Sequence, residues 1–488
     1  MPFPRSTPEA QGVRSSAILR FVEAADRDVR HLHSVMLLRR GTVIAEGYWD
    51  PFRATDPHLL FSLSKSFTST AIGMLAAEGR LTVDDPVLGH FPDEAPSAPS
   101  DTLQQMRVKH LLTMTTGHNV DATPRVRQGG PAWRRNFLAL PVEHEPGTHF
   151  VYNSAATYML SAIVQRLTGQ RVVEFLGPRL FEPLGIAAPT WETSPEGIDA
   201  GGWGLSARTA DIARFGQVYL QGGAWQGQQL VERAWVDEAT SFQVPNANSG
   251  TPNPDWQQGY GYQFWRCRHG VYRGDGAFGQ FCIVMPDQEA VLAITGGVAG
   301  MQEVLDLVWE HLLPSMKSEP LPEDAAQARQ LVDRLAGLRI APVSGKATSP
   351  CSGEISGRSF AMTPNDDGIS SIAFDFSADS ATLTIRNESG EQRVVCGHGR
   401  WARGEANVES AYRRHLGTQG PVPNAVAASG AWTAEDTYTA ELWWYLTPFR
   451  RTLTCRFTRD GVQVDQRANL SFGPTERPRL EGQAVGAR

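Results

Sequence analysis

The chain has 488 residues, of which 41% are hydrophobic and 20% charged; this composition is that of a folded globular protein and excludes a disordered one. At this length we expect two or three domains. The formal net charge of −7 without a basic tract disfavours nucleic acid as a partner, and no apolar run approaches the roughly 20 residues that cross a membrane.

The N-terminus and the cysteines predict a location for the protein. The first ten residues contain no apolar segment of the kind found in a secretory signal peptide. The five cysteines are scattered and have no C-x-x-C spacing: Cys267, Cys282, Cys351, Cys396 and Cys455. We therefore expect reduced, mostly buried thiols, no zinc site and a cytoplasmic protein.

Residues 1–315 predict a domain of mixed helices and strands. Apolar residues recur at helical spacing in some segments and alternate in others. The expected elements, in chain order, are a helix over 15–28, strands over 34–40 and 42–48, helices from about 62 to 78, 108–117 and 154–167, strands over 260–267, 270–274, 280–285 and 290–295, and a helix over 301–312. The first and last strands then share one antiparallel sheet flanked by helices, with a helical subdomain inserted between them, which is an α/β fold of the α+β type.

The remainder of the chain predicts a second domain. Residues 316–340 read as a linker, rich in Lys, Ser, Glu and Pro at its start, followed by a helix over 323–338. Residues 341–488 alternate between β-rich runs and Gly, Asn or Asp turns, which is typical of an antiparallel sandwich or small barrel. The expected strands are 354–362, 371–376, 381–386, 393–397, 437–446, 451–457 and 462–467.

A glycine-rich segment over 201–204 leads into another predicted helix. It resembles a phosphate-binding loop, but no strand precedes it and the G-x-G-x-x-G spacing is missing. We therefore expect a structural loop.

Ser62 and Lys65 stand three residues apart where a turn gives way to a helix. Residues at this spacing share a helix face, so the amine can reach the hydroxyl. A serine hydroxyl becomes a nucleophile when a neighbouring base takes its proton, and a desolvated lysine is such a base. The alternative is a helix-capping serine followed by a solvated lysine. Taken alone, the tetrad favours that alternative, because both residue types are common.

Two further motifs follow the S-x-x-K tetrad in order. Tyr152-Asn153-Ser154 opens a helix, and Arg273-Gly-Asp-Gly-Ala-Phe-Gly-Gln precedes a strand. Together with Leu-Leu-Thr-Met-Thr-Thr-Gly at 111–117 and Pro-Gly-Thr at 146–148, this set resembles the serine β-lactamase family in its class C and esterase branch. That branch also contains DD-peptidases, D-aminopeptidases and nylon-oligomer hydrolases. The resemblance extends over roughly residues 9–313.

The resemblance implies acyl transfer through a covalent ester of Ser62. Lys65 would activate Ser62, and Tyr152 would pass the proton to the leaving group. A phenol can do this only if a nearby ammonium lowers its pKa, and we expect Lys65 to do so. The backbone N–H groups of Ser62 and Ala277 would hold the oxyanion. The alternatives are a core tyrosine with a bonded hydroxyl at 152 and an ordinary strand residue at 277.

The sequence departs from the family pattern at two motifs. Where the third motif usually has Lys or His, then Thr or Ser, then Gly, this chain has Gly274-Asp275-Gly276. The missing cation would pair with a substrate carboxylate, whereas Asp275 would repel it and favour a neutral or amine-bearing substrate. The second motif has Ser154 where the β-lactamases carry Asn, with Asn153 one place earlier. Both departures favour an esterase or amidase over a β-lactamase or DD-peptidase.

The remaining candidates concern the walls of the site. Trp203 and Phe278 are expected to line the substrate pocket beside Asn153, Ser154, Asp275 and Gly276. His118, His144 and His149 lie near the presumed cleft rim, but their spacing matches no H-x-x-x-H or H-E-x-x-H metal motif, so they read as ordinary loop residues.

The sequence therefore predicts a serine hydrolase that acts on a small ester or amide, with no metal or organic cofactor and no nucleic-acid or membrane partner. The alternatives are a catalytically silent binding protein with the same fold, or a D-amino-acid-specific peptidase or β-lactamase. A silent relative has no physical need to keep Ser62, Lys65 and Tyr152 together. The C-terminal domain is expected to be structural, with a lid or a dimer contact as alternatives. The acyl group, the leaving group and the oligomeric state depend on loops that the sequence does not place.

Overall fold

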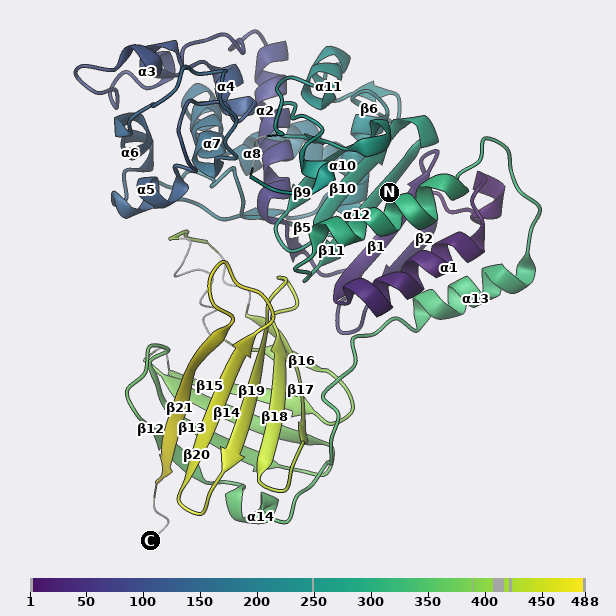
Figure 1. Cartoon of the computed structure of the whole chain (residues 1–488), viewed down its shortest axis with the longest axis vertical. Helices are drawn as coiled ribbons and strands as arrows, with labels where there is room; N and C mark the ends of the chain where they lie inside the picture. Colours follow the sequence, from purple (N-terminus) through teal and green to yellow (C-terminus); the bar gives the residue numbers. More distant parts are fainter. Residues whose placement is uncertain (1–2, 248–249, 389, 407–416, 421–423, 486–488) are drawn as a thin grey trace.

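The computed structural model describes residues 3–247, 250–388, 390–406, 417–420 and 424–485. Figure 1 shows two parts, a first domain of sheet and helices and a C-terminal barrel that lies against one side of it. Within the described ranges, no helix is both long and apolar enough to cross a bilayer.

The first domain is built on a six-stranded sheet with the order β2-β1-β11-β10-β9-β8. Every adjacent pair of strands is antiparallel, and Val35 in the first strand faces Ile294 in the last. The strands are β1 (Leu32–Arg39), β2 (Thr42–Tyr48), β8 (Trp265–Arg266), β9 (Tyr272–Gly276), β10 (Gln280–Met285) and β11 (Ala290–Gly296). The two ends of the domain therefore meet in one sheet, as the sequence predicts.

Helices cover both faces of this sheet (Figure 1). Val35 and Leu37 pack with α1 (Ser15–Ala24) and α12 (Met301–Leu307), whereas Met36 and Leu38 belong to the core beneath α10 (Thr209–Leu220). Because successive side chains of a strand point to opposite faces, a strand covered on both faces buries the side chains of both. This explains why all of β1 is buried.

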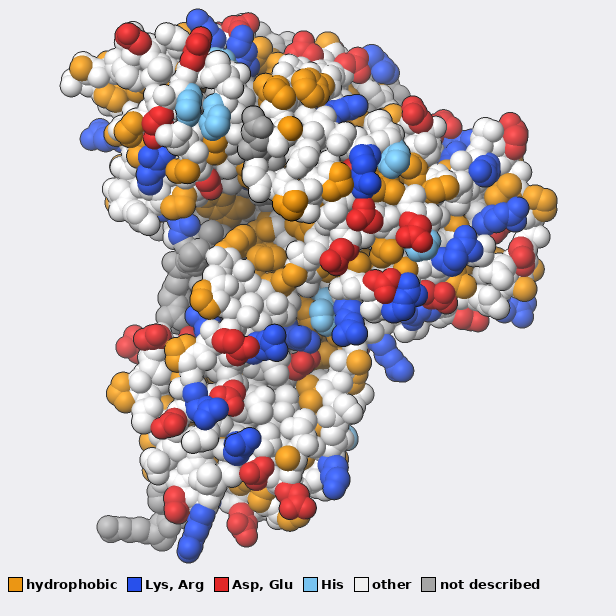
Figure 2. Space-filling view, viewed as in Figure 1, with side chains coloured by type: hydrophobic (Ala, Val, Ile, Leu, Met, Phe, Trp, Pro, Cys, Tyr) orange, Lys and Arg blue, Asp and Glu red, His pale blue; other side chains and the backbone are white. Residues whose placement is uncertain are grey.

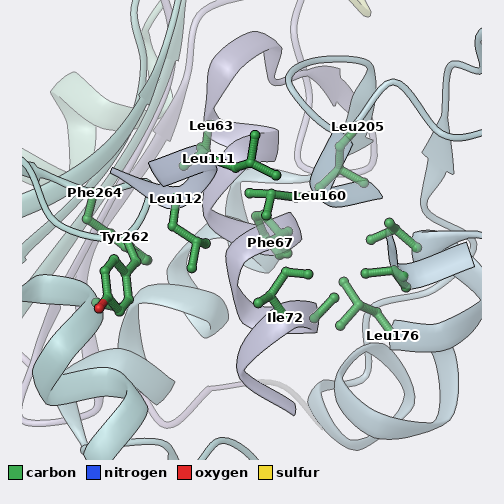
Figure 3. Packing of buried hydrophobic residues seen from close by; sticks show 14 of the residues in the cluster. Leu63, Phe67, Ile72, Leu111, Leu112, Leu160, Leu176, Leu205, Tyr262 and Phe264 are labelled. Atoms are coloured by element: carbon green, nitrogen blue, oxygen red, sulfur yellow. The ribbon is translucent and has the colours of Figure 1, made fainter. Parts of the chain in front are cut away.

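The inserted helical region packs around α2 (Ser64–Ala77), the helix that follows the S-x-x-K serine. Figure 3 shows Leu63, Phe67 and Ile72 of this segment surrounded by leucines from the neighbouring helices. Gly73 lies against the Trp235 ring, where an added Cβ would come within 2.5 Å of ring carbons. The helices of this region are α3 (Asp101–Gln105), α4 (Val108–Leu112), α5 (Thr123–Gln128), α6 (Trp133–Ala139), α7 (Ser154–Thr168), α8 (Val172–Leu176), α9 (Glu182–Leu184) and, after α10, α11 (Arg233–Thr240).

One predicted strand of the first domain is largely irregular. The segment 260–267 contains the two-residue strand β8 and no more. Gln263 adopts a left-handed backbone with φ of 66°, and its side-chain amide donates to the carbonyls of Leu111 and Leu112 at 3.1 and 2.7 Å. Tyr262 and Phe264 of this segment pack into the core around α2 and α10, whereas Tyr260 and Trp265 belong to a smaller separate cluster.

The helix α13 (Ala325–Ala336) follows the linker and returns to the first domain. Its Arg334 pairs with Asp26, and its Leu331 is buried in the same core as α1. Because the helix presents this apolar side chain to the first domain, it closes that domain before the chain enters the barrel.

In the described part of the C-terminal region, nine strands form a closed barrel. Closure comes from a parallel pairing of β15 with β17, and β16 pairs with β17 as an additional strand. The strands are β12 (Ser359–Met362), β13 (Ile369–Phe376), β14 (Ser380–Asn387), β15 (Gly390–Gly397), β16 (Ala402–Glu405), β17 (Ala425–Trp432), β18 (Thr437–Trp443), β19 (Arg450–Phe457), β20 (Gly461–Ala468) and β21 (Glu476–Ala484).

The barrel resolves the choice between a sandwich and a small barrel. The sequence did not predict β16, β17 and β21, since β17 reads Ala-Val-Ala-Ala-Ser-Gly-Ala-Trp and lacks the β-branched pattern. The start of the strand expected over 354–362 is a short helix, α14 (Ser352–Ile355).

The barrel is joined to the first domain by a buried aromatic contact. His33 stacks on Phe52 at 3.6 Å, Trp443 of the barrel meets both rings edge-on, and Nδ1 of His33 lies 3.0 Å from Nε2 of His58. Burial holds the pKa of His58 at about 4, so the pair is uncharged at neutral pH. Figure 2 shows hydrophobic side chains gathered at this junction.

Candidate active site

Ser62 lies in a 3-10 turn, Phe61–Leu63, that runs directly into α2. The turn follows the short strand β3 (His58–Leu59), which pairs with β5 (Leu205–Ala207). Leu63 behind the serine is fully buried, whereas Ser62 itself is partly exposed. The serine hydroxyl is thus held at the end of a rigid helix and faces a cavity.

Lys65 is fully buried beneath Ser62. Its Nζ lies 2.9 Å from Oγ of Ser62 and 2.9 Å from Oγ of Ser154, and it donates to the carbonyl of Gly202 at 2.7 Å. Burial lowers the pKa of Lys65 to about 7, although Asp121 and Asp275 oppose this shift. A neutral amine with two N–H donors and one lone pair fits these three partners, the lone pair then accepting the Ser62 proton.

Tyr152 lies over the Ser62–Lys65 pair. Nζ of Lys65 is 4.7 Å from the centre of its ring, which also stacks on Trp265 at 5.1 Å. Burial raises the pKa of Tyr152, Asp275 raises it further, and the hydrogen bond with Ser62 opposes the rise without cancelling it. The expectation that the pKa of this phenol is lowered is therefore wrong, because burial and the Asp275 carboxylate outweigh the influences that lower it. Tyr152 is a protonated hydrogen-bond donor in the unliganded site.

The third motif approaches the serine closely. An added Cβ on Gly276 would lie 1.9 Å from the carbonyl oxygen of Leu60, so any other residue would push β9 away from the Ser62 turn. Ala277, the next residue, lines the cavity together with Ser62. Gly276 thus has a structural role beside the site, whereas we expected it to contact substrate.

Asp275 also lines the cavity, but it is already paired. The fully buried Arg273 contacts its carboxylate twice at 2.9 Å, through Nε and Nη2. Arg273 further donates to the carbonyl of Asp255 at 2.7 Å and lies 4.1 Å above the Trp256 ring. Where the family motif has a cation, this chain therefore has an ion pair between Arg273 and Asp275 on β9. The Asp275 carboxylate faces the cavity.

The second motif divides its residues between two tasks. Asn153 is fully buried and caps α7, its Oδ1 accepting from the backbone N–H of Ala155 at 3.1 Å and of Ala122 at 3.3 Å. The expectation that Asn153 contacts substrate is not supported, since both oxygen partners are backbone groups of the fold. Ser154 lines the cavity and orients Lys65 through its hydroxyl.

The glycine-rich segment 201–204 is a structural loop, as expected, and it also serves the site. The Gly202 carbonyl fixes Lys65, and an added Cβ on Gly202 would lie 2.8 Å from the Ser154 carbonyl oxygen. Trp203 lines the cavity, in agreement with its predicted place in the wall. Phe278 is absent from the described lining residues, because its ring packs behind Phe61 and Phe472.

The cavity has a volume of about 550 Å³ and draws on distant parts of the chain. Sequence reasoning missed most of its lining residues, among them Asp121, Arg127 and Phe472. Oδ1 of Asp121 accepts from the backbone N–H of Ser154 at 3.2 Å and from Thr123, so it ties α5 to the start of α7. Asp121 lies four residues after the Thr-Met-Thr-Thr-Gly motif, a position that the motif alone did not single out.

The histidines near the rim do not join the catalytic group. His118 is buried with Nδ1 2.8 Å from the Thr116 hydroxyl, and the tilted rings of His144 and His149 lie 4.4 Å apart. Across the described ranges, no three His, Cys, Asp or Glu side chains gather as metal ligands would. All five cysteines are free thiols.

Comparison with known proteins assigns the family. The sequence profile of the Beta-lactamase family matches residues 23–301, more than half of the chain. The 6-aminohexanoate-dimer hydrolase of Paenarthrobacter ureafaciens is 31% identical over 280 residues, which cover 53% of this chain and 70% of that enzyme.

Two solved structures share the fold at low identity. A putative 6-aminohexanoate-dimer hydrolase from Bacillus anthracis is 18% identical with a TM-score of 0.54, over 66% of this chain and 89% of that one. A structure described as SurE is 16% identical with a TM-score of 0.50, over 96% of this chain and 99% of that one. On the evidence of the matching profile and the 31% identical relative, the chain belongs to the Beta-lactamase family.

Proposed function

We propose that this protein hydrolyses an amide or ester, or transfers its acyl group, through a covalent intermediate on Ser62. The observation that carries the proposal is the 2.9 Å approach of the Lys65 amine to the Ser62 hydroxyl at the floor of an open cavity. A buried lysine with its pKa near 7 is a base at neutral pH, whereas a solvated lysine is not. The relatives that are named hydrolases support the reaction class.

The first step forms the acyl-enzyme. Nζ of Lys65 takes the Ser62 proton while Oγ bonds to the substrate carbonyl carbon, and the negative charge develops on the carbonyl oxygen. The backbone N–H groups of Ser62 and Ala277 would bind that oxygen, because a donor aimed at the developing charge stabilises the transition state. The bond from carbon to the leaving nitrogen or oxygen then breaks.

Proton return completes the cycle. The leaving group needs one proton, which Lys65 now carries. The Tyr152 hydroxyl, hydrogen-bonded with Ser62, would donate a proton to it and take one from Lys65 in return. In the second half, water bonds to the ester carbon and gives a proton to Lys65, the bond from that carbon to Oγ of Ser62 breaks, and Lys65 returns the proton to Ser62 as the acid leaves. Ser154 keeps the amine aligned through both halves.

The charges of the cavity favour a substrate without a carboxylate next to the third motif. Asp121 and Asp275 both line the cavity, and the Arg273 partner of Asp275 is buried behind it. A penicillin-like carboxylate in this cavity would meet Asp121 and the carboxylate side of the Asp275–Arg273 pair, whose guanidinium is buried, whereas a neutral amide, an ester or an amine-bearing group would not be repelled. Among the described lining residues Arg127, on α5, is the cation, and an acidic group of the substrate would bind beside it.

The function is tested with paired substrates that share an acyl group. Wild-type protein is expected to release p-nitrophenol from p-nitrophenyl acetate with a burst of about one equivalent per chain, because acylation by an activated ester outpaces deacylation. p-Nitroacetanilide reports amidase activity in the same buffer. Turnover of neither substrate, with no burst, would contradict the proposal.

The rate is expected to rise with pH through about 7. Lys65 acts as a base only when neutral, and its pKa of about 7 in the folded protein means that it is protonated below that pH. On a neutral ester, kcat/KM should fall about tenfold for each pH unit below the transition. Asp121→Asn should shift the transition to lower pH, because the Asp121 carboxylate raises the pKa of Lys65. A flat profile from pH 5 to 9 would contradict the role of Lys65.

A further inference from the structure

One wall of the cavity comes from the C-terminal barrel. Phe472 lies between β20 and β21, and it lines the same cavity as Ser62. Its side chain is 54% exposed, which is unusual for a phenylalanine. An apolar ring left uncovered at the edge of a binding cavity is a surface that a ligand can cover.

The Phe472 ring belongs to a cluster of four phenylalanines, two from each domain. It lies 5.9 Å from Phe61 and 4.9 Å from Phe278, measured between ring centres. Phe449, from the loop between β18 and β19, lies 6.0 Å from Phe61 and 5.6 Å from Phe278. Tilted and edge-on contacts at these separations are favourable for aromatic rings.

The first-domain members of the cluster stand directly beside the two proposed oxyanion donors. Phe61 precedes Ser62 and Phe278 follows Ala277. Both have left-handed backbones, with φ of 48° and 69°. Such conformations are costly for residues other than glycine and persist where the surroundings hold them. The barrel rings pack on these two residues, so the barrel contacts both segments that carry the proposed oxyanion donors.

Hydrogen bonds fix the barrel loops in this position. The backbone N–H of Leu59, three residues before Ser62, donates to the carbonyl of Leu446 at 2.8 Å. Asn469 links the two barrel loops, because its side-chain amide donates to the Pro448 carbonyl at 2.9 Å and its Oδ1 accepts from the N–H of Arg450 at 2.7 Å. Phe472 therefore has a defined place relative to Ser62.

We propose that Phe472 is a specificity-determining residue, which contacts the apolar part of the substrate's acyl group and so makes the barrel a part of the active site. The inference rests on the proposed acyl transfer at Ser62. A long acyl chain on Ser62 extends further along the cavity than an acetyl group does, and we expect it to cover more of the exposed face of the ring. The contact thus favours longer acyl chains.

The test compares p-nitrophenyl octanoate with p-nitrophenyl acetate in the full-length protein. Phe472→Ala is expected to lower the octanoate-to-acetate ratio of kcat/KM about tenfold, the effect of losing contact with part of one apolar side chain. Phe472→Leu should keep most of the ratio, since it remains apolar. The matched control is Phe242→Ala, which removes an equally exposed ring (59%) outside the described lining of the cavity and should leave the ratio unchanged.

The outcomes separate this inference from the proposed function. Wild-type turnover with an unchanged or increased ratio in Phe472→Ala would overturn the contact while leaving acyl transfer intact. An equal fall of the ratio in Phe242→Ala would also overturn it, since the effect would then not be specific to the cavity. Failure of the wild type to hydrolyse either ester would contradict acyl transfer itself, and the role of Phe472 with it.

Discussion

Ser62→Ala and Lys65→Met are each expected to lower kcat on an activated ester by roughly 10⁴-fold, and the double variant by no more than either alone. The reason is that the two side chains act as one unit, with the amine 2.9 Å from the hydroxyl that it deprotonates. Once the base is gone the serine is an ordinary alcohol, and once the serine is gone the base has no proton to take. Methionine keeps most of the lysine's apolar stem, so the fold of α2 is retained.

The control for this prediction is Lys109→Met. Lys109 is a surface lysine on α4, and its side chain is 41% exposed. Its amine pairs with the Asp84 carboxylate at 2.7 Å. Its replacement should leave kcat within about twofold, as surface ion pairs contribute little. A double variant whose loss equals the product of the two single losses would contradict the assignment of Ser62 and Lys65 to one unit.

Arg273→Met is expected to destabilise the first domain by about 3–5 kcal/mol. The guanidinium is fully buried, and its removal leaves the buried Asp275 carboxylate without its cation and the Asp255 carbonyl without a donor. Burial already raises the pKa of Asp275, and Arg273 is the main influence that opposes this rise. The free energy of unfolding is measured by urea titration at pH 7, following the transition of the first domain.

Two variants make the result specific to the ion pair. Arg273→Met combined with Asp275→Asn should recover part of the lost free energy, because no unpaired carboxylate remains. Arg479→Met breaks an ion pair with Asp465 in which both side chains are about half exposed, and it should leave stability unchanged. If Arg273→Met were no more destabilising than Arg479→Met, the structural role of the pair would be wrong.

The sequence predicted the sheet and the grouping of Ser62, Lys65 and Tyr152, because the elements and motifs that form them are short and local. The hairpin 34–48, α2 and α7 each follow from periodicity within one segment, and the three motifs lie in short runs. The pairing of β1 with β11 followed from the order of the elements. The barrel strand β17 was missed, since a row of alanines and glycine carries little β-propensity until neighbouring strands cover it.

The residues that sequence reasoning misplaced are those whose role is set by three-dimensional neighbours. Asn153 looked like a substrate ligand, but the helix that it caps uses its side chain. Asp275 looked like a free anion, but Arg273 two residues earlier lies on the same face of β9 and pairs with it. Phe472 is more than 400 residues from Ser62 in sequence, so only the docking of the barrel brings its ring to the cavity.

The central claim, a nucleophilic Ser62, is tested most directly by the intact mass of the protein after exposure to a fluorophosphonate. The account predicts one phosphonyl adduct on the wild type, located on Ser62 by peptide mapping. The same treatment should give no adduct on Ser62→Ala and a much slower one on Lys65→Met. An unmodified wild-type protein, or equal labelling of wild type and Ser62→Ala, would contradict the account.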